Sequence, residues 1–100
     1  MVNKIRILVV DDSALMRKLI GKLLSPDESL VVIGHASDGQ EALEKLPKLQ
    51  PDIILLDLEM KGLGGLETIS RIREILPKLP ILVFSSHTPV SYTHLRAHET

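Results

Sequence analysis

Short apolar runs alternate along the chain with longer segments in which apolar residues recur every three or four positions. The short runs, at 4–10, 31–35, 53–57 and 81–84, predict strands, because a strand buried on both faces is apolar at nearly every position. The longer segments predict amphipathic helices after the first three runs. Strands that alternate with helices in this way favour a parallel sheet with right-handed crossovers. The predicted fold is a doubly wound α/β fold that is cut off after the fourth strand.

The helix starts and inner faces follow from the same pattern. Ser13 or Asp12 is expected to cap a first helix that runs to Leu24, and Asp38 with Glu41 resembles a capping box for a second helix that ends near Leu46. The residues expected on the apolar faces are Leu15, Leu19 and Leu23 in the first helix, and Leu66, Ile69, Ile72 and Leu76 in the third.

Glycines are concentrated between the third strand and the third helix, at Gly62, Gly64 and Gly65. A nucleotide-binding phosphate loop would end in Lys followed by Ser or Thr, and this segment does not. The glycines therefore predict a turn with positive φ rather than a phosphate site.

Carboxylates follow two of the apolar runs. Asp11 and Asp12 close the first run, and Asp57 closes the third. One such residue alone is more often a turn or cap residue. The carboxyl ends of parallel strands, however, lie at the edge of the sheet where ligands bind, and three carboxylates gathered there repel one another unless a hard cation binds among them. The sequence therefore predicts a Mg²⁺ site with one carboxylate that is available to react.

The composition is typical of one small globular domain, with 100 residues, 44% hydrophobic and 25% charged. A net charge of −1 gives no indication of a nucleic-acid or membrane partner, and no apolar stretch approaches the length of a membrane span. The absence of cysteine excludes disulfides and thiolate chemistry and suits a cytoplasmic location.

Three motifs in order resemble a response-regulator receiver domain. They are ILVVDDS (7–13), ASDGQEAL (36–43) and DIILLDLEM (52–60), and the likeness continues through GLET (65–68) to about residue 87. DSALMR (12–17), DLEM (57–60) and VFSS (83–86) are most similar to the regulatory domain of chemotaxis protein-glutamate methylesterases. The resemblance implies the flavodoxin-like strand order 2-1-3-4-5.

The resemblance also implies roles for individual residues. Asp57 matches the phospho-acceptor, which also contributes to the metal site. Asp12 matches the carboxylate that binds Mg²⁺ directly, and Asp11 the one that usually acts through water. Glu59 matches the position whose backbone carbonyl completes the metal ligands. Ser85 matches the hydroxyl residue that senses the phosphoryl group. The implied partners are a sensor histidine kinase as phospho-donor and a methylesterase output domain in cis, which is expected to be absent from this chain.

The sequence departs from the receiver pattern in three places. Lys61 and Gly64 stand where receivers usually have Pro and Asp. No lysine follows Lys78, whereas receivers carry one at the end of a fifth strand. Residues 1–87 are therefore expected to form a truncated receiver domain, and 88–100 a non-native or disordered tail whose last residues resemble an adapter-derived artefact of sequencing.

Two other functions remain open from the sequence. A phosphatase of the haloacid-dehalogenase type also uses a strand-end Asp and Mg²⁺, but its nucleophile begins an Asp-x-Asp motif that neither 11–13 nor 57–59 supplies. A pseudo-receiver that binds partners without phosphorylation would account for the missing lysine. We expect this chain itself not to be an enzyme, although its full-length parent would be a hydrolase.

Overall fold

The sheet and helices are those of an alternating β/α chain. The structure, a computed structural model, describes residues 3–60 and 64–85. Its elements in chain order are β1 (Ile5–Val10), α1 (Ala14–Leu24), β2 (Leu30–Ala36), α2 (Gly39–Leu49), β3 (Ile53–Asp57), α3 (Gly65–Ile75) and β4 (Ile81–Phe84).

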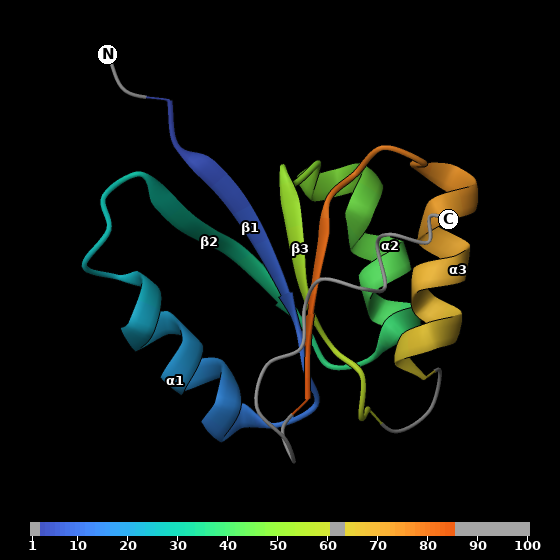
Figure 1. Ribbon diagram of the computed structural model, residues 1–100, viewed down its shortest axis with the longest axis horizontal. Helices are drawn as coiled ribbons and strands as arrows, with labels where there is room; N and C mark the ends of the chain where they lie inside the picture. Colours follow the sequence, from blue (N-terminus) through green and yellow to red (C-terminus); the bar gives the residue numbers. More distant parts are fainter. Residues whose placement is uncertain (1–2, 61–63, 86–100) are drawn as a thin grey trace.

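The strands form one parallel sheet in the order β2-β1-β3-β4 (Figure 1). This confirms the predicted α/β fold and agrees with the first four strands of the implied receiver order. Val10 is paired with Leu56, and Asp57 with Phe84, so the ends of β1, β3 and β4 come to the same edge of the sheet. Residues that follow these three strands are therefore neighbours in space although they are far apart in sequence.

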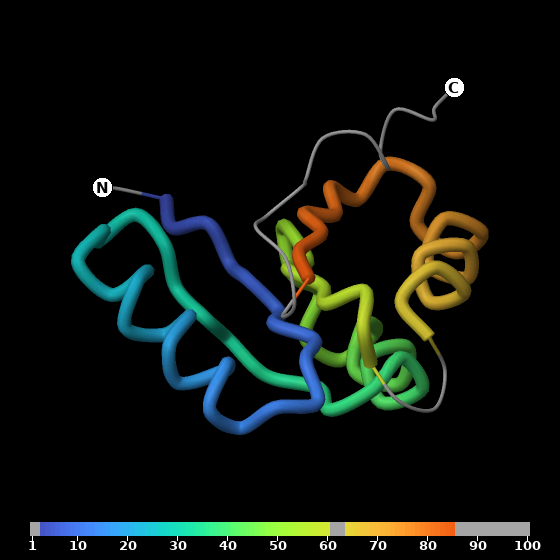
Figure 2. The backbone as a smooth tube through the Cα atoms, turned by 60° about the horizontal axis from the view of Figure 1, so that its bottom comes forward, coloured from blue at the N-terminus to red at the C-terminus, as the bar shows by residue number. Residues whose placement is uncertain are grey.

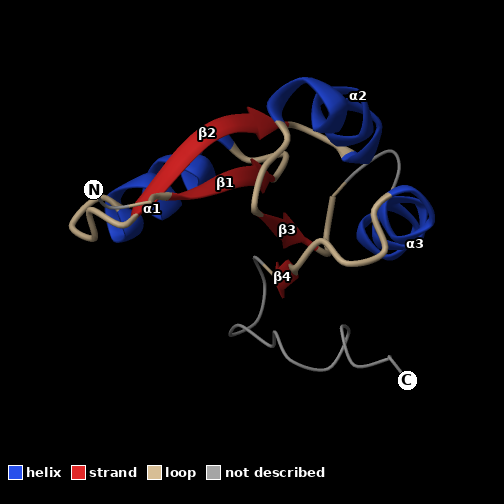
Figure 3. Cartoon of the chain, turned by 90° about the horizontal axis from the view of Figure 1, so that it is seen from above, coloured by secondary structure: helices blue, strands red, loops and turns tan. Residues whose placement is uncertain are grey.

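The helices cover both faces of the sheet, with α1 on one face and α2 and α3 side by side on the other (Figures 2 and 3). One apolar cluster joins α1 to the odd-numbered positions of β1 and β3, and a larger one joins α2 and α3 to the even-numbered positions. Leu8, Ile54 and Leu56 in the larger cluster are fully buried. For β1 and β3, the two central strands of the described sheet, the continuous apolar runs are thus explained by burial on both faces.

The predicted caps are confirmed for the first two helices. The Ser13 hydroxyl oxygen accepts a hydrogen bond from the backbone N–H of Met16 (3.2 Å). The Asp38 carboxylate accepts one from the N–H of Glu41 (2.8 Å), and the Glu41 carboxylate in turn accepts the N–H of Ser37 (2.8 Å). The bonds from Met16 and Glu41 satisfy backbone donors that a helix start leaves without an intrahelical partner, and the bond from Ser37 holds the residue before the cap.

Helix α2 continues to Leu49, past the predicted end near Leu46, with Pro47 inside its last turn. A proline removes one helical hydrogen bond, but the end of α2 gains other partners. Arg6 on β1 donates to the carbonyls of Leu49 (2.7 Å) and Gln50 (2.5 Å), and Gln50 ends the helix in the left-handed conformation with φ of 49°. A long-range contact that the sequence pattern does not reveal therefore sets this boundary.

The prediction for the apolar face of α1 was wrong. Leu15, Leu19 and Leu23 are 68%, 45% and 78% exposed. Helix α1 instead packs on the sheet through Met16, Ile20 and Leu24. The two sets have the same spacing and are one residue apart, so periodicity alone does not distinguish between them.

The prediction for α3 was right for its middle and wrong for its ends. Ile72 is fully buried and Ile69 packs against the core, whereas Leu66 and Leu76 are 64% and 38% exposed. The inner face is completed by Thr68, which is fully buried because its hydroxyl donates to the carbonyl of Gly64 (2.7 Å). The buried face of α3 therefore includes a polar residue, Thr68, which a search for apolar positions alone does not find.

The expected positive φ is absent from the two described glycines of the loop before α3. Gly64 has φ of −69°, and Gly65 is the first residue of the helix. Gly65 is needed for close packing instead, as described below. Lys61, Gly62, the proposed boundary at 87 and the tail 88–100 lie outside the described residues. Among the helices of 3–60 and 64–85, none is long and apolar enough to cross a membrane.

Candidate metal and phosphoryl site

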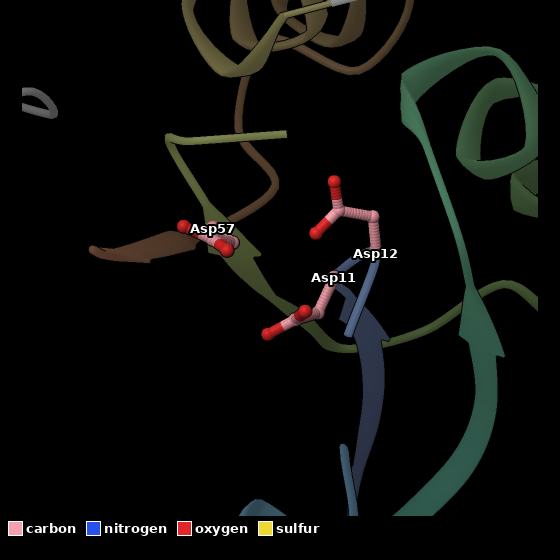
Figure 4. Close-up of side chains that lie close together, drawn as sticks. All are labelled: Asp11, Asp12 and Asp57. Carbon is pink, nitrogen blue, oxygen red and sulfur yellow. The ribbon is translucent and has the colours of Figure 1, made fainter. Parts of the chain in front are cut away.

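Three aspartates converge at the shared edge of β1 and β3 (Figure 4). One carboxylate oxygen from each of Asp11, Asp12 and Asp57 lies within 4.8 Å of the others. Asp11 and Asp57 are fully buried, whereas Asp12 is exposed, so the cluster is reached from solvent on the Asp12 side. The sequence-based expectation that these three residues come together is therefore met in the structure.

Asp11 is held by hydrogen bonds at three of its four polar atoms. Its N–H donates to the carbonyl of Ala36 (2.9 Å), its Oδ1 accepts the N–H of Ser13 (2.6 Å), and its own carbonyl accepts Nη1 of Arg17 (2.7 Å). Its remaining atom, Oδ2, is buried and has no hydrogen-bond partner among the described residues. The Asp11 side chain is thus fixed with one oxygen left for a ligand.

Asp57 shows the same division between its two oxygens. Oδ1 accepts the N–H of Glu59 (2.9 Å), and Oδ2 is buried without a hydrogen-bond partner in the described part of the chain. A buried carboxylate oxygen that accepts no hydrogen bond is costly unless a ligand binds it. The cluster of three carboxylates fits a hard divalent cation, since Mg²⁺ takes oxygen ligands and is commonly bound by one or two carboxylates together with water. The donor set therefore matches the implied metal.

The electrostatics of the cluster agree with this interpretation. Burial raises the pKa of Asp11 above its usual value, and the neighbouring charges of Asp57 and Asp12 raise it further. The hydrogen bond from Ser13 and the charge of Arg17 act in the opposite direction. A cation bound among the three carboxylates would remove the repulsion that raises this pKa.

Glu59 and Ser85 lie near Asp57, Glu59 two residues after it in the chain and Ser85 at the end of the neighbouring strand β4. Glu59 is exposed and contacts the Asp57 carboxylate through its N–H. Ser85 is half-buried and follows Phe84, which is paired with Asp57 across β3 and β4. The N–H of Leu58 donates to the carbonyl of Phe84 (2.8 Å), which ties the residues after β3 to the end of β4. Both predicted residues are therefore on the same edge of the sheet as the aspartates.

Two contributors to this edge were missed from the sequence. No role for Arg17 was predicted from the sequence, yet it reaches back to the loop that carries Asp11. A Cβ on Gly65 would lie 2.6 Å from Cα of Leu58 and 3.0 Å from the carbonyl oxygen of Asp57, so α3 approaches the loop after β3 closely. The Gly-rich composition of 62–65 indicated a special backbone there, but not this contact.

Comparison with known proteins assigns this arrangement to a family. A family model described as the response regulator receiver domain matches residues 7–98. The chain is 53% identical over 81 residues to a protein-glutamate methylesterase/protein-glutamine glutaminase of Syntrophomonas wolfei, and 49% identical over 84 residues to the one of Bacillus subtilis. These matches cover 81% and 84% of this chain and 23% of each relative, so the chain spans about a quarter of their length.

Solved structures show the same likeness. The response regulator domain of Thermotoga maritima CheB is 38% identical with a TM-score of 0.79, and the match covers 91% of this chain and 67% of that one. The isolated receiver domain of RcsB from Salmonella enterica serovar Typhimurium, determined with the phosphomimetic BeF3⁻, is 29% identical with a TM-score of 0.78. That match covers 83% of this chain and 62% of the other.

Proposed function

The chain belongs to the response regulator receiver family and is similar to the receivers of CheB methylesterases, and from this premise we propose that Asp57 accepts a phosphoryl group from a sensor histidine kinase. The observation that carries the proposal is the buried Oδ2 of Asp57, which has no hydrogen-bond partner among the described residues and belongs to a cluster of three carboxylates.

Oδ2 of Asp57 is the nucleophile in the proposed reaction. Its bond to phosphorus forms as the bond between phosphorus and the donor imidazole nitrogen breaks, and the electron pair of that bond stays on the imidazole. Oδ1 remains on the N–H of Glu59, which holds the carboxylate in one orientation during the attack. A carboxylate is a weak nucleophile, so positioning and charge neutralisation must supply most of the catalysis.

Asp11, Asp12 and Asp57 would hold Mg²⁺. Asp57 would do so through the second lone pair of Oδ1, which leaves Oδ2 available to attack. The backbone carbonyl of Glu59 is the fourth protein ligand that the family resemblance implies. When bound, the ion neutralises negative charge on the carboxylates and on the phosphoryl oxygens. Ser85, at the end of β4, is proposed to donate its hydroxyl to the phosphoryl group and so to sense its arrival. The pairing of Asp57 with Phe84 supports this role for the next residue.

The proposed output follows from the relatives. Since they are protein-glutamate methylesterases and this chain spans about a quarter of their length, we propose that phosphorylation controls a methylesterase domain in the full-length protein. The step would take place in the cytoplasm as part of a chemotaxis pathway. The haloacid-dehalogenase alternative is set aside because the chain belongs to the receiver family.

Intact-mass spectrometry tests the proposal. The chain is incubated with phosphoramidate as a small-molecule donor, with and without Mg²⁺, and the expected product is a single phosphoryl adduct that requires Mg²⁺ and is labile to hydroxylamine. Asp57→Asn should form no adduct. Because no lysine follows Lys78, we expect slow labelling, and faster labelling when a receiver segment carrying the fifth-strand lysine is restored.

The matched control is Asp52→Asn, which removes a carboxylate just before β3 and outside the cluster, and which should leave the adduct unchanged. An adduct of equal yield on Asp57→Asn would refute the assignment. Failure to label even the restored receiver, with Mg²⁺ binding intact, would favour the pseudo-receiver function instead.

A further inference from the structure

Arg17 links helix α1 to the loop that carries the acidic pair. Arg17 is half-buried, and its guanidinium donates through Nη1 to the main-chain carbonyl of Asp11 (2.7 Å). Its own N–H donates to the carbonyl of Ser13 (3.0 Å) in the first turn of α1, so its backbone is fixed within the helix. The side chain therefore reaches from an ordered helix back to the end of β1.

The carbonyl that Arg17 binds belongs to the peptide unit between Asp11 and Asp12. A peptide unit is planar, so fixing its carbonyl also fixes the direction of the Asp12 N–H and limits rotation about the bonds on either side. Asp11 has further anchors at Ala36 and Ser13, whereas Asp12 is exposed. Fixing this peptide unit restrains the backbone from which the Asp12 carboxylate approaches the cluster.

We propose that Arg17 is a positioning residue for the metal site, which orients the Asp11–Asp12 peptide unit so that both carboxylates meet Asp57. This inference rests on the proposed Mg²⁺ site. Partners of metal ligands that do not touch the metal commonly change its affinity by ten- to a hundredfold when they are lost.

The direction of the effect separates positioning from simple charge. A positive guanidinium near the cluster repels a second cation, so a residue that acted only through its charge would weaken Mg²⁺ binding, and its removal would tighten binding. A residue that holds the ligands in place has the opposite signature, because its removal weakens binding. The sign of the change in the dissociation constant is therefore decisive.

The test is a titration of the ¹⁵N-labelled 100-residue chain with MgCl2, followed by heteronuclear NMR. It yields the dissociation constant and, before metal is added, the amide signal of Asp12, whose N–H belongs to the peptide unit that Arg17 holds. For Arg17→Gln we expect about tenfold weaker binding and a displaced or broadened Asp12 signal in the metal-free spectrum. Arg17→Lys keeps the positive charge but loses the planar guanidinium. Its dissociation constant for Mg²⁺ should lie between those of the unchanged chain and Arg17→Gln.

Lys18→Gln is the matched control, because it removes the same charge from an exposed neighbour on the same helix. It should bind Mg²⁺ as the unchanged chain does. Unchanged or tighter binding by Arg17→Gln, or an equal loss in Lys18→Gln, would overturn the inference and leave the metal site standing. If Arg17→Gln does not fold, the test rests on Arg17→Lys, and a Mg²⁺ dissociation constant for Arg17→Lys equal to that of the unchanged chain overturns the inference. Absence of Mg²⁺ binding by the unchanged chain would refute the metal site and the inference together.

Discussion

The backbone of Gly65 lies directly against that of Leu58, so that a Cβ on Gly65 would be 2.6 Å from Cα of Leu58 and 2.9 Å from its carbonyl oxygen. Backbone atoms have little freedom to move away. We expect Gly65→Ala to lower the free energy of unfolding by about 1–3 kcal/mol, the usual range for overpacking, even though alanine favours the helix. The measurement is urea unfolding followed by circular dichroism.

Gly64→Ala is the control for this prediction. Gly64 has extended backbone angles, and a Cβ there would meet nothing within 4 Å. Its effect should stay within about 0.5 kcal/mol, as for other surface substitutions. Equal destabilisation by the two variants would show that the loop is sensitive to any loss of glycine and that the contact with Leu58 is not the cause.

Asp57→Asn should stabilise the metal-free chain, because it removes one of three negative charges whose oxygens lie within 4.8 Å. We expect the free energy of unfolding to rise by about 1 kcal/mol. This is well below the repulsion between two carboxylates at this distance at an effective dielectric constant of 20. The gain is smaller because the new buried amide also needs hydrogen-bond partners. The same variant should lose most of the stabilisation that Mg²⁺ gives the unchanged chain. Thermal melts with EDTA and with Mg²⁺ measure both effects.

Glu74→Gln provides the comparison, since it removes a negative charge from an exposed position on α3, away from the cluster. It should change stability little and leave the response to Mg²⁺ intact. A gain equal to that of Asp57→Asn would trace the effect to net charge and not to the cluster.

In the metal-free chain, the contribution of Asp11 to the free energy of unfolding should decrease as the pH rises above about 4. Burial, and then Asp57 and Asp12, raise the folded-state pKa of Asp11 above the unfolded value of 3.8. The folded chain then binds the proton more tightly than the unfolded chain, so this contribution is complete below the unfolded pKa and disappears as the pH passes the folded pKa. Urea unfolding across this range in EDTA should show a flatter dependence for Asp11→Asn. An identical dependence in both proteins would contradict the prediction.

The meeting of the three aspartates was predictable because it depends on features that a sequence states directly. Each carboxylate follows a continuous apolar run, and parallel pairing of Val10 with Leu56 brings the run ends together. The capping residues Ser13 and Asp38 were predictable for a similar reason, since a cap depends on neighbours within one turn. Local patterns and strand ends were therefore sufficient for most of the site.

The rotation of α1 and the reach of Arg17 were not predictable in this way. The stripe headed by Leu15 and the one headed by Met16 have the same spacing and nearly the same apolar character, and only packing against Ile7 and Val9 decides which is buried. Likewise, the bond from Arg17 to the Asp11 carbonyl depends on how α1 is set against β1. Such facts belong to tertiary packing, which periodicity along one helix does not encode.

The chain should self-associate through β4, the last strand of the described sheet. Next to it is an apolar groove of about 400 Å³, and Leu82 on β4 is 36% exposed. The groove is lined by Met16, Ile20, Leu23, Leu24, Leu55, Leu82, Phe84 and Ser85. An edge strand beside an apolar groove favours addition of another strand, and a lysine on the edge discourages it. We therefore expect Leu82→Lys to reduce self-association, as measured by sedimentation velocity over a range of concentrations.

Leu66→Lys is the matched variant for this prediction, because Leu66 is even more exposed, at 64%, but lies on α3 on the other face of the sheet. It should leave self-association unchanged, since the added charge is far from the β4 edge. Equal suppression by both variants would indicate nonspecific apolar association. A chain that sediments as a monomer at every concentration would contradict the prediction and would mean that another part of the chain already covers β4. Fusion to a receiver segment that supplies the next strand should in either case give a monomer, because the edge is then paired.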